Sequence, residues 1–198
     1  MSAMSPFTIR QYGDPVLRQV GEPVKEFGST LRMLGEAMLV TMHQAKGIGL
    51  AAPQIGLSLQ LFVAHVNDDE NQPILDGKVV HTADIMPILF ANASVKIIAG
   101  EPEIYTEGCL SFPGITGEVK RVEAAIVDYR DADGAPHTLE CRGLLARCVQ
   151  HEYDHCQGVL FIDRMLREDQ LATASKVKKL KKATTTALKA AQKKPPVS

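Results

Sequence analysis

Hydrophobic residues recur at helical spacing in three parts of the chain. Leucine and methionine side chains repeat every three or four positions over residues 29–45, which predicts an amphipathic helix. A second helix is predicted over residues 143–157, with Gly158 as its C-terminal stop. A third is predicted to begin near Arg164, to continue into a lysine-rich segment, and to fray before Pro195.

Between the first two helices, the pattern changes to short runs with the alternation of β-strands. The sequence Asp131-Ala-Asp-Gly134 is typical of a hairpin turn between the last two runs, and the polar residues 67–85 are predicted to form a surface loop. The predicted strands are residues 59–66, 87–98, 119–129 and 137–142. Because the strands follow one another instead of alternating regularly with helices, the pattern favours an α+β fold.

Length and composition restrict the class of protein. A chain of 198 residues that is 45% hydrophobic can bury one core, so a disordered or fibrous protein is excluded. No apolar run reaches the roughly 18 residues of a transmembrane helix, so no membrane partner is expected. The first residues lack the basic and apolar regions of a secretion signal, which predicts a cytoplasmic protein.

The net charge of −1 conceals a strong asymmetry along the chain. Residues 176–198 contain eight lysines and no acidic residue, whereas the preceding residues contain 14 basic and 23 acidic side chains. A basic tail on an acidic body favours an anionic partner such as nucleic acid, although a solvated helix end would have the same composition.

The sequence His151-Glu-Tyr-Asp-His155 is the strongest chemical signal in the chain. On a helix, residues four apart lie on the same face, so both imidazoles can bind one metal ion. Glu152 is turned by about 100° from His151, so it can flank the ion and act as a base on a nearby water molecule. Two ordinary surface histidines beside a glutamate are the alternative.

A catalytic site of this kind needs a third protein ligand. Position 161 is Phe, not the histidine of a longer zinc-protease motif, and Glu168 is the only glutamate after the second histidine. Spacing alone does not exclude the remaining histidines, which are His43, His65, His81 and His137.

A cysteine is the better candidate for the third ligand. Cys148 is about 10.5 Å along the helix axis from His155, which is too far for one ion, so a role in the core is favoured. Cys156 is turned away from the histidine face and is expected to pack in the core. Cys109 follows Gly108, which permits close backbone approach, but spacing favours this residue only modestly.

Three segments together resemble the peptide deformylase family. They are Gly47-Ile-Gly-Leu-Ala-Ala-Pro-Gln54, Glu107-Gly-Cys-Leu-Ser111 and the histidine motif with its following glycine. Their order and rough spacing match the family, and the likeness covers about residues 7–170. The resemblance implies mostly antiparallel sheets packed around a central helix that carries HExxH, with a C-terminal helix. Residues 1–175 would be one catalytic domain and residues 176–198 a basic tail, part helix and part disordered.

The resemblance also implies a site. Cys109, His151 and His155 would bind one divalent metal, Fe²⁺ in the native enzyme, with Zn²⁺, Ni²⁺ or Co²⁺ as substitutes. Glu152 would be the general base, and the Gln54 side chain and the Leu110 backbone N–H would bind the oxyanion. The reaction would remove the formyl group from the N-terminal formyl-methionine of newly made proteins.

The substrate methionine needs an apolar pocket, and a peptide chain could lie against the small loop around Gly49. The candidate pocket residues are Ile48, Leu50, Ile115, Val119, Leu144 and Cys148, for each of which a core role fits equally well. The lysine-rich tail favours association with ribosomal RNA, beside which nascent chains emerge. A metal-dependent amidase for another acyl group, and a metal-binding module without catalysis, are the alternatives.

Overall fold

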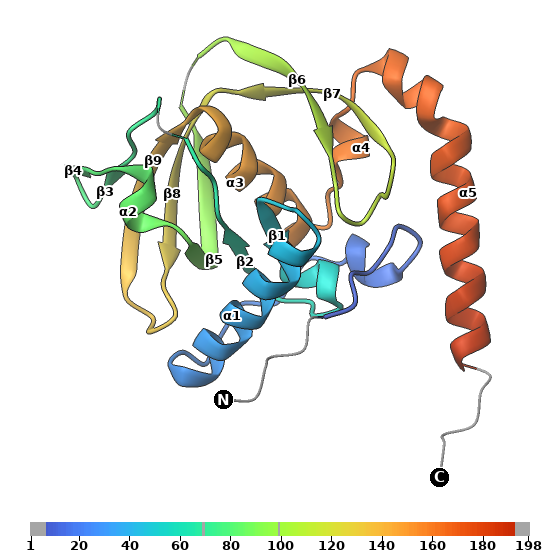
Figure 1. Ribbon diagram of the computed structural model, residues 1–198, viewed down its shortest axis with the longest axis horizontal. Helices are drawn as coiled ribbons and strands as arrows, with labels where there is room; N and C mark the ends of the chain where they lie inside the picture. Colours follow the sequence, from blue (N-terminus) through green and yellow to red (C-terminus); the bar gives the residue numbers. More distant parts are fainter. Residues whose placement is uncertain (1–6, 69, 99, 193–198) are drawn as a thin grey trace.

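The computed structural model describes residues 7–68, 70–98 and 100–192. These residues form an antiparallel seven-stranded sheet of order β1-β2-β5-β8-β9-β3-β4 and a separate antiparallel pair, β6-β7 (Figure 1). The strands are β1 (Gly49–Ala51), β2 (Leu61–Ala64), β3 (Ile74–Leu75), β4 (Lys78–Val79), β5 (Ile88–Ile97), β6 (Pro102–Gly108), β7 (Thr116–Val122), β8 (Ala124–Arg130) and β9 (Pro136–Arg142). The α-helices are α1 (Ser29–Gln44), α2 (Thr82–Ile85), α3 (Gly143–Cys156), α4 (Phe161–Arg164) and α5 (Arg167–Gln192).

The large sheet is covered on both faces, and β2 shows why. All four of its side chains are buried, but Phe62 and Ala64 join the core cluster beneath α3, whereas Leu61 and Val63 pack with Met38 and the rest of α1. Successive strand side chains point to opposite faces, so a continuous apolar run marks a strand buried on both sides. The expected α+β fold, with antiparallel sheets around the helix that carries HExxH, is confirmed.

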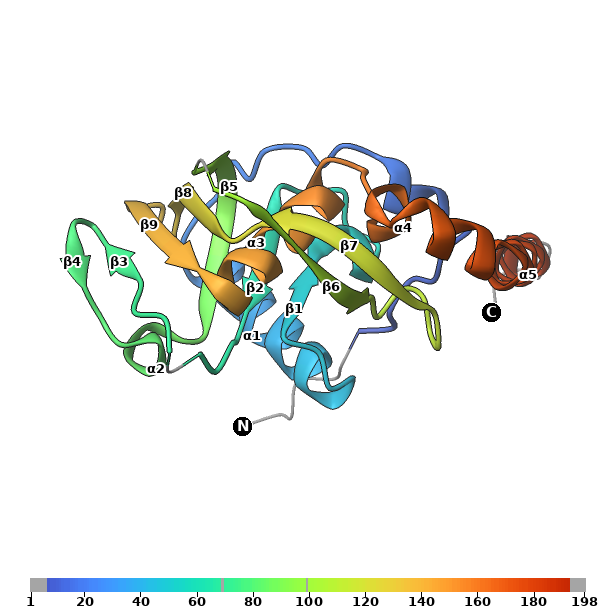
Figure 2. The ribbon, with the colours of Figure 1, turned by 90° about the horizontal axis from the view of Figure 1, so that it is seen from above.

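A third core cluster joins β7 to the C-terminal part of the chain. Val119 packs with Leu17, Phe112 and Phe161, and α5 adds Val177 to its edge. The helix α5 lies at one end of the molecule, and the small β3–β4 hairpin lies at the opposite end (Figures 1 and 2).

Several predicted boundaries agree with the structure. The first helix runs over Ser29–Gln44 and the second over Gly143–Cys156. The turn between β8 and β9 is the predicted hairpin, in which the Asp131 side chain accepts hydrogen bonds from the backbone N–H groups of Asp133 and Ala135.

The single strand predicted over residues 119–129 is wrong. The chain leaves β7 at Val122 and enters β8 at Ala124, which belongs to the other sheet. Odd-numbered residues from Gly117 to Tyr129 are buried on both sides of this break, apart from the exposed Glu123 between the strands. Because the alternation keeps its phase, periodicity alone could not reveal the change of sheet.

Two further predictions differ from the structure, each for its own reason. The strand β6 was missed because only Glu107 among its side chains is buried, so it has no hydrophobic alternation. The predicted surface loop 67–85 contains β3, β4 and α2, and β3 pairs with β9. The turn between β3 and β4 is Asp76-Gly77, both with positive φ, which is a hairpin signal that the sequence does contain.

The C-terminal helix begins later than predicted. Residues near Arg164 form the short α4, and α5 then runs from Arg167 to Gln192 without a break at residue 175. The predicted fraying before Pro195 falls outside the described residues. None of the described helices combines the length and the apolar composition that spanning a membrane requires.

Candidate metal centre and active-site cavity

Three potential metal ligands converge where β6 meets α3. His151 and His155 lie one turn apart on α3, and Cys109 directly follows β6. The Cys109 Sγ atom lies 3.2 Å from His155 Nε2, and one ligand atom from each residue lies within 4.8 Å of the others. The two elements come from different parts of the fold, so helix spacing alone could not have identified this cysteine.

The ring of His151 is oriented by a buried carboxylate. Its Nδ1–H donates to Glu107 Oε2 over 3.0 Å, which leaves Nε2 for the cluster. Burial alone would raise the pKa of Glu107, but hydrogen bonds from His151 and Arg121 outweigh it and lower the pKa to about 2. Glu107 is therefore a carboxylate at neutral pH and can only accept hydrogen bonds.

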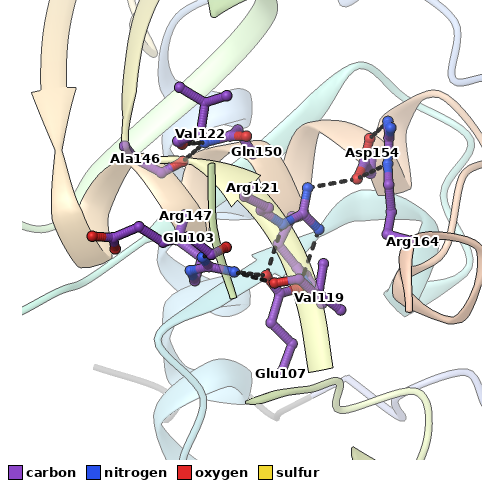
Figure 3. A network of polar contacts seen from close by, with 11 residues as sticks. Glu103, Glu107, Val119, Arg121, Val122, Ala146, Arg147, Gln150, Asp154 and Arg164 are labelled. Carbon is purple, nitrogen blue, oxygen red and sulfur yellow. Dashed lines mark hydrogen bonds and ion pairs between the residues drawn. The ribbon is translucent and has the colours of Figure 1, made fainter. Parts of the chain in front are cut away.

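Two arginines compensate this buried charge, and a second carboxylate extends the network (Figure 3). Arg121 donates to both oxygens of Glu107, at 2.7 and 3.1 Å, and to Asp154 Oδ2 at 2.8 Å. Arg147 adds a bond of 2.8 Å to Glu107 Oε1, and Arg164 binds Asp154 from the outer side. The sequence analysis assigned no role to Glu107, Arg121 or Arg147. The one available signal was that Glu107 lies two residues before Cys109, in a segment that resembles the family.

The donor set fits a divalent transition metal. Burial holds the pKa of His155 well below its ordinary value, so its imidazole is neutral, as a metal ligand must be. One sulfur and two imidazole nitrogens suit iron, zinc, cobalt or nickel, and three protein ligands leave a coordination position for water or substrate. The residues present therefore fit the group that the resemblance implies.

Glu152 lies beside this cluster and is the most unusual carboxylate of the site. Its side chain is buried, its Oε2 atom has no hydrogen-bond partner among the described residues, and burial raises its pKa to about 7. A carboxyl group that gains and loses a proton near neutral pH is suited to general acid–base catalysis. A Cβ atom on Gly49 would lie 2.5 Å from Glu152 Oε1, so this glycine makes room for the carboxylate.

Gln54 presents its amide nitrogen to the cluster. Its Oε1 atom accepts a 2.8 Å hydrogen bond from the backbone N–H of Ala51, which turns Nε2 towards Cys109 Sγ at 3.5 Å and Ser111 Oγ at 3.4 Å. The side chain is fully buried, so the alternative of an exposed loop amide is excluded. Leu110, whose backbone N–H is the other expected donor, lines the same cavity.

A cavity of about 640 Å³ opens in front of Cys109, His151 and Glu152. It brings together most of the residues expected to bind substrate, which are Ile48, Gly49, Ile115, Leu144 and Cys148. Cys148 also packs in the core beneath the large sheet, so the core role and the lining role apply together. The buried Cys156 lies in the same core cluster, as expected.

Two expected pocket residues lie elsewhere. Leu50 is fully buried in the core cluster of α1, because its side chain points to the opposite face of β1 from Ala51, which packs in the cluster beneath α3. Val119 is fully buried among the residues of the third core cluster. Neither forms part of the cavity wall.

Comparisons with known proteins agree with this geometry. The family model for polypeptide deformylases matches residues 6–171. A peptide deformylase from Opitutus terrae is 47% identical over 185 residues, which cover 91% of this chain and 96% of that protein. The chain belongs to the peptide deformylase family.

Solved deformylase structures extend the likeness to three dimensions. The crystal structure of peptide deformylase from Thermus thermophilus superimposes with a TM-score of 0.76 at 39% identity, covering 90% of this chain and 99% of that one. A peptide deformylase from Plasmodium falciparum gives 0.78 at 32% identity, covering 90% and 98%. The resemblance inferred from the motifs is confirmed, and the chain is a hydrolase of the deformylase type.

Proposed function

We propose that this deformylase removes the formyl group from the N-terminal formyl-methionine of newly made proteins in the cytoplasm, with one divalent metal held by Cys109, His151 and His155. The observation that carries the proposal is the buried Glu152 carboxyl, whose Oε2 atom has no hydrogen-bond partner in the described part of the chain. It lies beside three convergent ligands, at the wall of a partly apolar cavity. A purely structural metal site has no use for a base beside an open coordination position.

The metal, Fe²⁺ in the native protein and replaceable by Zn²⁺, Ni²⁺ or Co²⁺, would make a water molecule acidic near neutral pH and polarise the formyl carbonyl. Glu152 accepts a proton from the attacking water and later donates it to the amine nitrogen as the carbon–nitrogen bond breaks. The products are formate and a peptide with a free N-terminal methionine.

Gln54 and Leu110 act on the formyl oxygen. As the formyl carbon becomes tetrahedral, this oxygen gains negative charge, and the Nε2 group of Gln54 and the backbone N–H of Leu110 donate to it. The hydrogen bond between Gln54 Oε1 and Ala51 N keeps the amide in the donating orientation before substrate arrives. Removal of one such donor typically costs about 3–4 kcal/mol of transition-state stabilisation.

The methionine side chain of the substrate occupies the apolar part of the cavity. Ile115 and Cys148 are buried there, while Ile48 and Leu144 are 43% and 44% exposed and flank the mouth. Burial of the first side chain holds the formyl group against Glu152, since binding energy from a remote group is available to orient the reacting one. Gly49 allows the peptide backbone to approach this edge of the cavity.

A pair of acyl peptides tests the substrate. Formate release from formyl-Met-Ala is expected, whereas acetyl-Met-Ala should remain intact because the larger acyl group adds a methyl group at the reacting carbon. Cleavage of the acetyl peptide alone would contradict the assignment.

The variant Glu152→Gln tests the role of the base. It should keep its metal and lose activity by about 10²-fold or more. Unchanged turnover in this variant would contradict the role given to Glu152.

We also propose that the lysine-rich half of α5 contacts ribosomal RNA. The lysines of the described part of this segment, which are Lys176, Lys178, Lys179, Lys181, Lys182 and Lys189, are exposed. Because Val177 and Leu180 of the same helix pack against the third core cluster, charge removal is a cleaner test than truncation.

The test compares two sets of lysine substitutions in otherwise intact protein. Glutamine at Lys176, Lys178, Lys179 and Lys182 should weaken co-sedimentation with ribosomes and reduce its salt dependence. Glutamine at the exposed Lys25, Lys78 and Lys120, outside the segment, is the control. Equal sedimentation of the two variants would contradict the proposed contact, and activity on short peptides should be the same in both.

A further inference from the structure

Two histidines outside the active site meet at the surface of the molecule. His43 lies in the last turn of α1, and His65 directly follows β2. The Nε2 atom of His43 lies 2.9 Å from Nδ1 of His65, the ring centres are 5.0 Å apart, and the ring planes cross at 70°. His43 is exposed and His65 is half-buried, so solvent and small ions can reach the pair.

The backbone that carries the pair is fixed by the fold. The His65 N–H donates to the carbonyl oxygen of Ile48 over 2.8 Å. Beneath the two rings, Met42 of α1 and Val63 of β2 pack in one core cluster. The Cα atoms of the pair are therefore held in place, and a ligand needs only side-chain rotation to contact both rings.

The pair has no carboxylate partner. Among the described residues, the ring nitrogens of His43 and His65 hydrogen-bond only to each other. In contrast, His151 donates to Glu107, and His137 lies between two carboxylates. In the hydrogen bond of the pair, one nitrogen carries the hydrogen and the other accepts it. A metal ion that replaces this hydrogen is bound by the lone pairs of both nitrogens.

The spacing of the two nitrogens fits a particular coordination geometry. Metal–nitrogen bonds of about 2.0–2.1 Å place two ligands at right angles about 2.9 Å apart and tetrahedral ligands about 3.3 Å apart. The observed 2.9 Å therefore matches adjacent corners of a square or an octahedron. Nickel(II) and copper(II) adopt such tetragonal geometry with nitrogen and oxygen ligands.

We propose that His43 and His65 form a second metal site, which binds one divalent ion that favours square or octahedral coordination, such as Ni²⁺ or Cu²⁺. The described residues supply no third protein ligand to this pair, so water molecules complete the coordination shell. The site is separate from the cluster of Cys109, His151 and His155, and it does not depend on the proposed function.

A bound ion links two elements behind one wall of the active-site cavity. Residues 45–48 connect α1 to β1 and line that cavity. At one end of this segment the His43 carbonyl oxygen accepts a 3.0 Å hydrogen bond from Lys46 N, and at the other end His65 donates to Ile48. Occupancy of the site therefore restrains the segment at both ends, and it stabilises the folded protein because the two rings are brought together only in that state.

A nickel titration of untagged protein already loaded with one equivalent of Ni²⁺ tests the site. The catalytic cluster then holds its ion, so any further binding comes from elsewhere. Isothermal titration calorimetry should show one additional equivalent, and excess Ni²⁺ should raise the Tm. His43→Ala and His65→Ala should each lose this second binding event and the rise in Tm.

His81→Ala is the matched control. His81 is exposed, and among the described residues its ring contacts only the Gln72 amide, at 3.5 Å. Because His81 has no second imidazole beside it, this variant should keep the second equivalent and the rise in Tm. The first equivalent of nickel should be retained in all three variants, which checks that each is folded with its catalytic cluster intact.

Two results would overturn the proposal. One is the absence of a second equivalent from the unmodified protein. The other is a second equivalent that persists in His43→Ala or in His65→Ala, or that is lost equally from His81→Ala, since the nickel would then bind elsewhere on the surface. The titration measures no turnover, so a failure of this site is distinguishable from a failure of the proposed function.

Discussion

Two histidine–carboxylate pairs in this molecule look alike locally and differ in everything around them. His151 Nδ1 lies 3.0 Å from Glu107, and His137 Nδ1 lies 2.7 Å from Asp76. The side chains of the first pair are 11% and 6% exposed, whereas those of the second are 27% and 48% exposed. The length of the hydrogen bond therefore does not separate a functional pair from a surface pair.

The second ring nitrogen makes the difference. At His137 it lies 3.4 Å from another carboxylate, Asp131, so both nitrogens are occupied and the ring joins two surface turns. At His151 the second nitrogen faces Cys109 and His155. A histidine with one nitrogen held by a buried carboxylate and the other turned to further ligands is arranged for metal binding.

The largest effect is expected where the buried pair is broken. Glu107→Ala would leave Arg121 with only one of its two carboxylates and His151 without its acceptor. We expect a loss of about 3–5 kcal/mol in the free energy of unfolding, and metal affinity should fall about 10–100-fold. Denaturant unfolding and metal titration measure these quantities.

The surface pair supplies the control for that variant. Asp76→Ala should lower the free energy of unfolding by less than about 1 kcal/mol, because solvent screens an exposed ion pair, and it should leave metal affinity unchanged. Similar losses in the two variants would contradict the distinction drawn between the pairs.

A smaller and purely catalytic effect is expected from Gly49→Ala. The new Cβ would displace the Glu152 carboxylate, and a shift of about 1 Å can reduce turnover about 100-fold. Since the atoms that the new Cβ meets all belong to the Glu152 side chain and none to the backbone, metal content and thermal stability should be retained. Gly100→Ala, where the added Cβ meets only ordinary van der Waals contact, should leave turnover unchanged. Full activity of Gly49→Ala would show that the position of Glu152 is not critical.

The smallest effect depends on pH and belongs to the surface pair. The hydrogen bond to Asp76 raises the pKa of His137, while the same bond lowers the pKa of Asp76. The ion pair therefore contributes stability that is fully present below the ordinary histidine pKa near 6.5 and is lost as pH rises through the raised value.

His137→Gln tests this sign. The variant should lose up to about 1 kcal/mol of unfolding free energy at pH 6 and less at pH 9, with denaturant unfolding as the measurement. A larger loss at pH 9 would reverse the assigned sign.

The same contrast explains what the sequence could predict. HExxH predicted His151, Glu152 and His155 as candidate site residues, because helix geometry alone places them within about one turn of α3. Cys109 and Gln54 came from the family likeness, since their approach to α3 depends on how β6 and the β1 loop pack. Glu107, Arg121 and Arg147 were missed, because a charged residue that will be buried and compensated looks in sequence like any surface charge.

The fold was predictable to a similar extent. Helices such as α1 and α3 carry a long periodic signal, and α+β followed from the succession of strands. The strand β6 has exposed side chains, and the β7–β8 boundary keeps its alternation, so both are defined by the strands that they pair with: β7 pairs with β6, and β8 pairs with β5 and β9. The choice of pairing partner is not visible in a local hydrophobic pattern.

The central claim is that one cation is shared by a cysteine after β6 and two histidines of α3. X-ray absorption spectroscopy of the metal-loaded protein tests it most directly, with Cys109→Ser as the comparison. The account predicts one sulfur and two imidazole nitrogens around the metal, with the sulfur signal absent from the variant. A metal shell without sulfur in the unmodified protein would contradict it.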